Sequence, residues 1–175
     1  INFENFGSDD FYVDIEIICL ANTLLKKLIP NSNFTLNINT LGARENLSAY
    51  KKILSNFFND NKKSLSKESI DKINTNPLRI LDSKNPEDSE IIIKSPKLID
   101  LISKTDFNNY EEIKQCLTGL GITIFEDLNL VRGLDYYCQT VFEFKTNELG
   151  SQDTLIGGGR YDGLIKMLGG KDIPG

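Results

Sequence analysis

Hydrophobic and polar positions in the first 43 residues follow two different periods. Apolar side chains recur at helical spacing over residues 14–29 and predict a helix, with Asp14 as its cap and Pro30 at its end. Residues 33–39, NFTLNIN, alternate apolar and polar side chains, which predicts a half-buried strand. The opening segment INFENF is expected to be the end of another strand.

The next 75 residues, 44–118, change to a helical pattern, and strand patterns return after them in ITIFED, YCQTVFEF and DTLIGGG. A short helix is expected in RYDGLIKMLGG. Strands interrupted by a block of helices predict an α+β fold, a sheet domain that carries an inserted helical subdomain. The expected division is 1–43 for the first part of the sheet domain, 44–118 for the insert and 119–175 for the second part. The apolar residues that define the helices are Leu47, Tyr50, Leu54, Phe57, Phe58, Phe107, Tyr110, Ile113, Leu117 and Leu120.

The composition limits which residue types can carry catalysis or bind a metal. The 175 residues include no histidine and three cysteines without a CxxC pair, which excludes histidine-based catalysis within the chain and argues against a zinc site. Carboxylates, tyrosines, lysines, arginines and backbone groups remain. No apolar run approaches the roughly 20 residues that a membrane helix needs, and the acidic start does not resemble a signal peptide.

Charge is distributed unevenly along the chain. Residues 44–118 hold 13 basic and 12 acidic side chains, whereas the other residues hold 7 basic and 13 acidic ones. The basic residues of the insert include the doublets Lys51-Lys52 and Lys62-Lys63. Two interpretations stay open at this point: a solvated helical face, or a surface that weakly contacts a polyanion.

The segment LVRGLDYYCQTVFEF places one of only four arginines, Arg132, before a tyrosine pair, Tyr136 and Tyr137. Arginine can hold a phosphate or carboxylate with two parallel hydrogen bonds, and a tyrosine hydroxyl both donates and accepts. Neighbouring side chains of an extended chain point to opposite faces, so both tyrosines reach one pocket only if the backbone kinks, for which Gly133 is a candidate. The alternative is a buried aromatic strand with an ion pair between Arg132 and Asp135.

A second segment, LIGGGRYDGL, has three successive glycines, which let the backbone approach a ligand closely. Arg160 and Asp162 flank Tyr161 directly after them. The alternative is a tight corner between a strand and a helix. In the opening segment Glu4, taken alone, indicates only a surface residue.

Together these segments resemble the histidyl-tRNA synthetase family. LVRGLDYYCQTVFEF followed by GGRYDGL is similar to the histidine-specific signature of that family. TNPLRILDSKNP, residues 75–86, is similar to the signature of the insertion subdomain in its bacterial-type members. The opening ENFG and the helix beginning DIEII resemble the region after class II motif 2, so the resemblance runs over the whole chain in order.

The resemblance implies a class II catalytic core, an antiparallel sheet flanked by helices, in a cytoplasmic homodimer. Residues 1–43 and 119–175 would form the two parts of that core, and 44–118 the insertion subdomain. The family activates L-histidine with ATP and Mg²⁺ to histidyl-adenylate and then transfers histidine to tRNA(His). No metal site made of protein ligands is expected in this chain.

The resemblance also implies roles for single residues. Arg132 matches the catalytic arginine, which contacts the α-phosphate region of ATP, and Glu4 matches the acceptor of a hydrogen bond from imidazole. The remaining assignments are Tyr136 and Tyr137 for the histidine pocket, Tyr161 and Gly157 for its wall, Gly158 and Gly159 for ATP or adenylate, and Lys51, Lys52, Lys62 and Lys63 for a weak tRNA contact. If the insert serves only tRNA, its deletion is expected to spare adenylate formation.

Several parts of the family pattern are not seen in these residues: motif 1, the arginine of motif 2, motif 3 and the anticodon-binding domain. The chain is therefore expected to be part of a catalytic core, inactive by itself. The first alternative is the regulatory synthetase-like subunit of ATP phosphoribosyltransferase, which typically lacks the helical insert and the intact signature. A second alternative is an RNA-binding or scaffolding module, which would not need an intact GLDYY.

Overall fold

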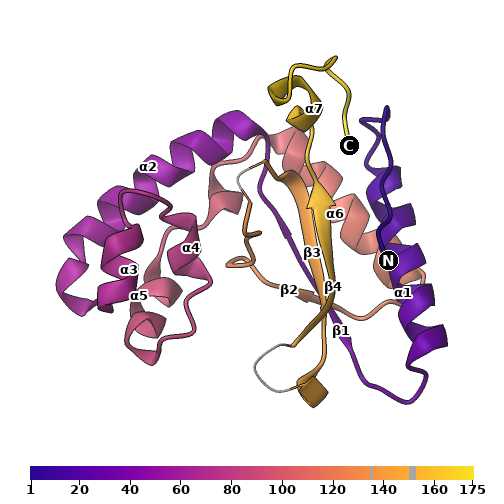
Figure 1. Ribbon diagram of the computed structural model, residues 1–175, viewed down its shortest axis with the longest axis horizontal. Helices are drawn as coiled ribbons and strands as arrows, with labels where there is room; N and C mark the ends of the chain where they lie inside the picture. Colours follow the sequence, from indigo (N-terminus) through magenta and orange to yellow (C-terminus); the bar gives the residue numbers. More distant parts are fainter. Residues whose placement is uncertain (135, 150–152) are drawn as a thin grey trace.

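A four-stranded sheet forms the centre of the computed structural model, which describes residues 1–134, 136–149 and 153–175 (Figure 1). The strand order is β2-β1-β3-β4. The strands are β1 (Thr35–Thr40), β2 (Ile124–Glu126), β3 (Cys138–Lys145) and β4 (Thr154–Arg160). β1 runs antiparallel to β3, and β3 antiparallel to β4, but β1 and β2 are parallel. The predicted α+β fold is confirmed; the sheet is mixed, since two of its three strand pairs are antiparallel, as expected, and the β1–β2 pair is parallel.

Two long helices, α1 (Tyr12–Leu28) and α6 (Lys104–Gly119), pack on one face of this sheet (Figure 1). Their apolar faces meet Leu36 of β1 and Phe144 of β3 in one buried cluster. The Tyr110 hydroxyl of α6 donates to the carbonyl oxygen of Ile38 at 3.2 Å, which fixes α6 against β1. Each fully buried apolar side chain of the cluster, such as Leu36 or Phe144, stabilises the fold by roughly 1.5–3 kcal/mol relative to its exposure to water.

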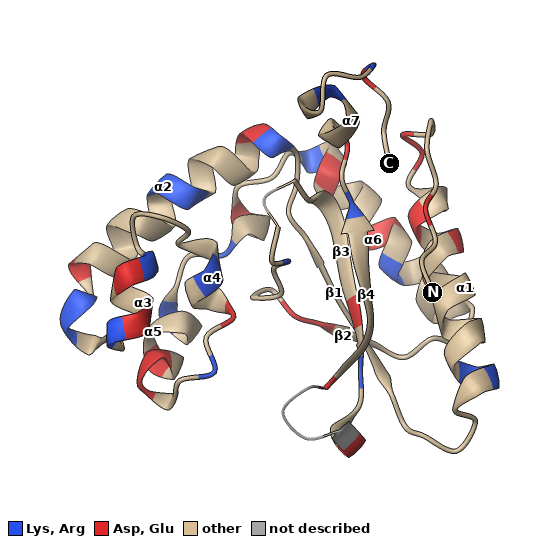
Figure 2. Ribbon diagram, in the orientation of Figure 1, with Lys and Arg blue, Asp and Glu red and all other residues tan. Residues whose placement is uncertain are grey.

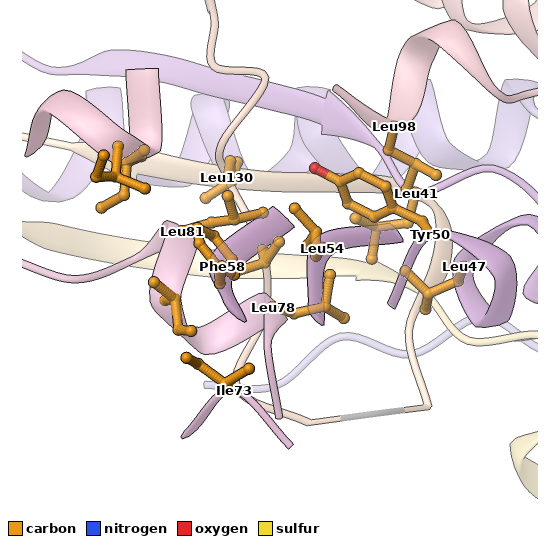
Figure 3. Close-up of a cluster of buried hydrophobic side chains, with 14 of the residues drawn as sticks. Leu41, Leu47, Tyr50, Leu54, Phe58, Ile73, Leu78, Leu81, Leu98 and Leu130 are labelled. Carbon is orange, nitrogen blue, oxygen red and sulfur yellow. The ribbon is translucent and has the colours of Figure 1, made fainter. Parts of the chain in front are cut away.

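The other helices form a second body beside the sheet (Figure 1). They are α2 (Arg44–Asp60), α3 (Lys67–Lys72), α4 (Leu78–Leu81) and α5 (Ser89–Lys94), joined by 3₁₀ turns at Lys62–Ser64, Pro86–Asp88 and Leu98–Asp100. Their apolar cluster is built from Tyr50, Leu54 and Phe58 of α2 against Leu78 and Leu81 of α4 (Figure 3). Leu130, Val131 and Val141 of the sheet domain belong to the same cluster, so the two bodies share apolar contacts.

A buried carboxylate organises the loops of this second body. Asp88 has no exposed surface and accepts hydrogen bonds from the backbone N–H of Ser66 and from the hydroxyls of Ser66, Ser69 and Ser83, at 2.6–2.9 Å. Burial alone would raise the pKa of Asp88, but these donors outweigh it and hold the pKa below the usual range. The carboxylate thereby connects the start of α3 with the segment that follows α4.

Packing of α6 bears on the predicted domain boundary at residue 118. Tyr110, Ile113 and Leu117 of α6 are buried in the cluster under α1, not in that of α2–α5. We therefore propose that the insert ends near Ser103, whose side chain caps α6 by accepting from the N–H of Asp106. Short remaining elements are the 3₁₀ turn Asn147–Leu149 and α7 (Leu164–Met167).

Three local predictions are wrong. Residues 1–10 contain no helix or strand, and no described strand pairs with INFENF. Asp14 does not cap α1, because the helix begins earlier, at Tyr12 with Phe11 before it, and Asp14 lies in its first turn. Strand β1 is buried on both faces, since Asn39 donates to the carbonyl oxygen of Leu130 at 2.9 Å and the segment after β2 covers the expected polar face.

Candidate active site

Three tyrosine rings gather where β3 begins and β4 ends. The ring centroids of Tyr136 and Tyr137 lie 4.6 Å apart, and those of Tyr136 and Tyr161 lie 5.8 Å apart with nearly perpendicular planes. Tyr136 lies in a turn and Tyr137 directly precedes β3, so the two tyrosines are not on an extended strand and need not point to opposite faces. The chain bends at Gly133 and Leu134, where a kink was expected, and a second irregularity follows in β3, where Gln139 has φ +48° and the β3–β4 register shifts. Burial and the neighbouring Tyr137 hydroxyl raise the pKa of Tyr136, so its hydroxyl stays protonated at neutral pH.

Arg132 lies over Gly157, the first glycine of the run in β4. Its Nη1 donates to a carboxylate oxygen of Glu143 on β3, and its guanidinium carbon lies 5.8 Å from the ring centroid of Tyr137. Glu143 is held in turn by the Thr154 hydroxyl at 3.1 Å and is 3.4 Å from Nζ of Lys145. The alternative ion pair with Asp135 falls outside the described residues. The described partner of Arg132 is Glu143.

The glycine run of β4 is closely packed on both faces. A β-carbon at position 157 would lie 2.6 Å from Nη1 of Arg132, and one at position 159 would lie 2.6 Å from the carbonyl oxygen of Thr140. A β-carbon at position 158 would lie 3.0 Å from the Phe142 ring. Glycine is therefore required here because side chains and backbone approach β4 closely. A tight corner between a strand and a helix, the alternative explanation, would not by itself require this close packing.

A cavity of about 150 Å³ extends along β4, between this strand, α1 and the first residues of the chain. Glu4, Tyr137, Tyr161 and the three glycines are among the residues that line it. The Tyr161 hydroxyl donates to the Glu4 carboxylate, so two predicted site residues 157 positions apart in the chain are in direct contact. Glu4 itself is exposed and also accepts from the side-chain amide of Asn2 at 2.8 Å.

Arg160 is a structural arginine beneath this cavity. Its buried guanidinium donates to Asp14 Oδ1 at 2.8 and 3.0 Å, to the carbonyl oxygens of Ser8 and Asp10, and to Asp162. These bonds tie the segment that precedes α1 to the end of β4. Because all of its donors face protein groups, Arg160 fixes the cavity floor and does not serve as an anion-binding group.

The predicted tRNA-contact lysines lie away from this site. Lys51 and Lys52 are on α2, Lys62 and Lys63 are in the turn that follows it, and none of the four lines the cavity along β4. Figure 2 shows basic and acidic residues side by side on these helices. This mixture of charges along the helices leaves both interpretations of the lysines open.

Among the described residues, no group of three or more cysteines or carboxylates is placed to hold a metal ion. In the same part of the chain, no helix has the length and apolar content needed to cross a bilayer.

Two site residues were not predicted. Glu143 is the acidic residue in the middle of the otherwise apolar VFEF, and this interruption was the available signal. Arg79, in the 75–86 segment, has its guanidinium against Gly133, directly after Arg132. The contact joins residues 54 positions apart and has no signal in local pattern.

A comparison with family models decides the family, because the histidyl-tRNA synthetase model matches residues 1–175. The chain belongs to the histidyl-tRNA synthetase family. Among curated relatives, histidine–tRNA ligases of Ehrlichia canis and Neisseria gonorrhoeae are 47% and 44% identical over 174 residues, 99% of this chain. The chain spans about two fifths of the length of these relatives, 42% and 40%.

Solved structures of the family share the fold. Apo histidyl-tRNA synthetase from S. aureus superimposes with a TM-score of 0.71 at 28% identity, covering 97% of this chain and 41% of that one. A protein from Bacillus halodurans described as an ATP phosphoribosyltransferase regulatory subunit/histidyl-tRNA synthetase gives a TM-score of 0.60 at 24% identity, covering 97% of this chain and 47% of that one. The second likeness concerns the fold alone.

Proposed function

We propose that the protein to which this chain belongs activates L-histidine with ATP to histidyl-adenylate and pyrophosphate, and then transfers histidine to tRNA(His). The observation that carries the proposal is the contact of Glu4 with Tyr161 beside the Tyr136–Tyr137 pair, at a cavity lined by the β4 glycines, of which Gly157 also lies against the Arg132 guanidinium. Within the family this chain supplies part of the catalytic core.

Histidine recognition is assigned to the carboxylate and the tyrosine hydroxyls. Imidazole has two ring nitrogens, so Glu4 can accept from one N–H while the hydroxyl of Tyr137, which lines the same cavity, serves the other nitrogen. Tyr161 holds Glu4 in place before substrate arrives. Once a bound side chain shields the site from water, an amino acid without these nitrogens leaves the carboxylate and the hydroxyl unpaired, at about 1–3 kcal/mol each.

Adenylate formation is assigned to Arg132. When the histidine carboxylate attacks the α-phosphorus, negative charge grows on the phosphate oxygens, and a preorganised guanidinium stabilises that charge most in the transition state. Glu143 and Gly157 hold the guanidinium in one position, and Gly158 and Gly159 give the nucleotide a flat surface. Mg²⁺ would arrive on the ATP phosphates, the usual way in which this ion reaches nucleotide sites.

The remaining partners belong to the same proposal. We extend it to a homodimer, a cytoplasmic location and contact of the insert lysines with tRNA(His), and membership of the family supports this extension. The mixed charge of the second body supports no more than a weak RNA surface.

The competing function is the regulatory subunit of ATP phosphoribosyltransferase, which the fold of the Bacillus halodurans protein keeps under consideration. Histidine-dependent ATP–pyrophosphate exchange by the full-length protein separates the two functions. A synthetase exchanges pyrophosphate only when histidine is present. A protein that binds histidine without exchange, and that stimulates ATP phosphoribosyltransferase, would contradict the proposal.

A further inference from the structure

The 75–86 segment contacts the sheet domain at the residues on both sides of Arg132. On one side, Val131 and Leu130 are buried in the cluster that contains Leu78 and Leu81 of α4 (Figure 3). Consequently the backbone that enters Arg132 is fixed by the apolar core of the insert and not by the sheet alone.

On the other side, the Arg79 guanidinium lies flat against Gly133. A β-carbon at position 133 would lie 2.9 Å from Nη2, 3.3 Å from Cζ and 3.4 Å from Nη1 of Arg79. Gly133 has no positive φ, so its lack of a side chain serves this contact and not an unusual backbone.

Glu143, the partner of Arg132, also lies near the same segment. Burial and then the charge of Glu143 raise the pKa of Asp82, which follows α4, while Lys145 and Arg79 act in the opposite direction. Asp82 is thus close enough to feel the charge of Glu143, the residue that holds the Arg132 guanidinium. Little more than one helical turn therefore supplies three residues that lie beside neighbours of Arg132. Leu78 shares a cluster with Val131, Arg79 contacts Gly133, and Asp82 lies near Glu143.

We propose that Arg79 is a positioning residue for the proposed adenylation reaction, through which the insert sets the place of Arg132. The inference deepens the proposed function and rests on it. It also argues against the expectation that an insert devoted to tRNA can be deleted without loss of adenylate formation, because deletion would expose Leu130 and Val131 and release the Gly133 turn.

The test is a double-mutant cycle between Arg79→Ala and Gly133→Ala in the full-length protein, followed by pyrophosphate exchange. Arg79→Ala should lower kcat by about tenfold to a hundredfold, the cost of a small misplacement of a catalytic group, with little change in the KM for histidine. Gly133→Ala should lower kcat in the wild-type background, because its β-carbon displaces the Arg79 side chain. In the Arg79→Ala background the same substitution should change kcat little. Lys94→Ala, which removes a surface ion pair with Glu90 on α5, is the matched control and should exchange normally.

Each outcome decides the inference. Two results together support positioning. The effects of Arg79→Ala and Gly133→Ala on kcat should not be additive, and the double variant Arg79→Ala/Arg132→Ala should have a kcat no lower than that of Arg132→Ala. Wild-type kcat in Arg79→Ala, or an equal cost of Gly133→Ala in both backgrounds, would overturn it. If Arg79→Ala is purified with fewer competent sites by adenylate burst but with unchanged kcat per site, the residue is merely structural and the inference is wrong. A wild-type protein without histidine-dependent exchange would overturn the proposed function and this inference with it.

Discussion

A β-carbon on Gly157 would lie 2.6 Å from Nη1 of Arg132, so the glycine leaves the space that the guanidinium occupies. The glycine run of β4 and the arginine before β3, 25 residues apart in the sequence, are therefore parts of one arrangement. Glu143, opposite Gly157 in the β3–β4 ladder, completes it by accepting from the same nitrogen.

Gly157→Ala should displace Arg132 and slow adenylate formation by about tenfold to a hundredfold, while the fold is retained. The rate is measured by histidine-dependent pyrophosphate exchange in the full-length protein. Gly119→Ala, at the end of α6, is the control, because a β-carbon there meets nothing within 4 Å. If both variants exchange at the same rate, Arg132 does not depend on this space.

Tyr161→Phe should weaken histidine binding, because Glu4 loses the hydroxyl that orients it. The expected cost is about 1–3 kcal/mol, which is roughly tenfold for each 1.4 kcal/mol. Calorimetric titration with histidine and with ATP measures it, and ATP affinity should change little. Tyr12→Phe removes a similar hydroxyl, which donates to Glu112 at 3.1 Å on α6, outside the cavity. Equal histidine affinity in the two variants would show that Tyr161 does not belong to the histidine-binding pocket.

Much of the fold follows from periodicity. The helical spacing of Tyr50 and Leu54 and the alternation in NFTLNIN correspond to α2 and β1 in the structure. Periodicity does not predict partners, however. The polar face of β1 is buried because Asn39 bonds to the Leu130 carbonyl, a contact over 91 residues. In the same way, α6 has the pattern of the insert helices but packs under α1.

The candidate site was predicted from its signature and not from local chemistry. Glu4 by itself has the pattern of a surface residue, and only its contact with Tyr161 indicates a role. Glu143 and Arg79 were missed because their significance lies in side-chain contacts with Arg132 and Gly133, which no single segment contains.

The Asp88 carboxylate should make the insert sensitive to acid. Its folded pKa lies below the unfolded value of about 3.9, so it stabilises the fold above that pH and the contribution is lost as the pH falls through the folded pKa. Hydrogen exchange of the amides of α3 and α4 in the full-length protein should show protection that decreases below about pH 4.

The matching variant is Asp88→Asn. It should lower that protection at pH 7 by about 2–4 kcal/mol, because an amide cannot accept from all four donors, and it should remove most of the acid dependence. Asp60→Asn, at the exposed end of α2, is the control and should behave like the wild type. Wild-type protection in Asp88→Asn would show that the serine hydroxyls do not need the carboxylate.

Replacing Lys51, Lys52, Lys62 and Lys63 by alanine tests the tRNA surface. Each phosphate contact that is lost should reduce the slope of log K against log salt by roughly 0.7–0.9, while pyrophosphate exchange stays normal. Filter binding of tRNA(His) at several salt concentrations measures the slope. Lys26→Ala/Lys27→Ala on α1 is the control, since these exposed lysines lie outside the insert. An unchanged slope in the fourfold variant would assign its lysines to solvation alone.

The most direct measurement of the central claim is single-turnover formation of histidyl-adenylate by the full-length protein and its Arg132→Ala variant, with histidine affinity determined in parallel. The account predicts a rate at least about a hundredfold lower, as for loss of a group that stabilises developing charge, with histidine affinity close to that of the wild type. A wild-type rate of adenylate formation in Arg132→Ala, with only histidine affinity reduced, would contradict it.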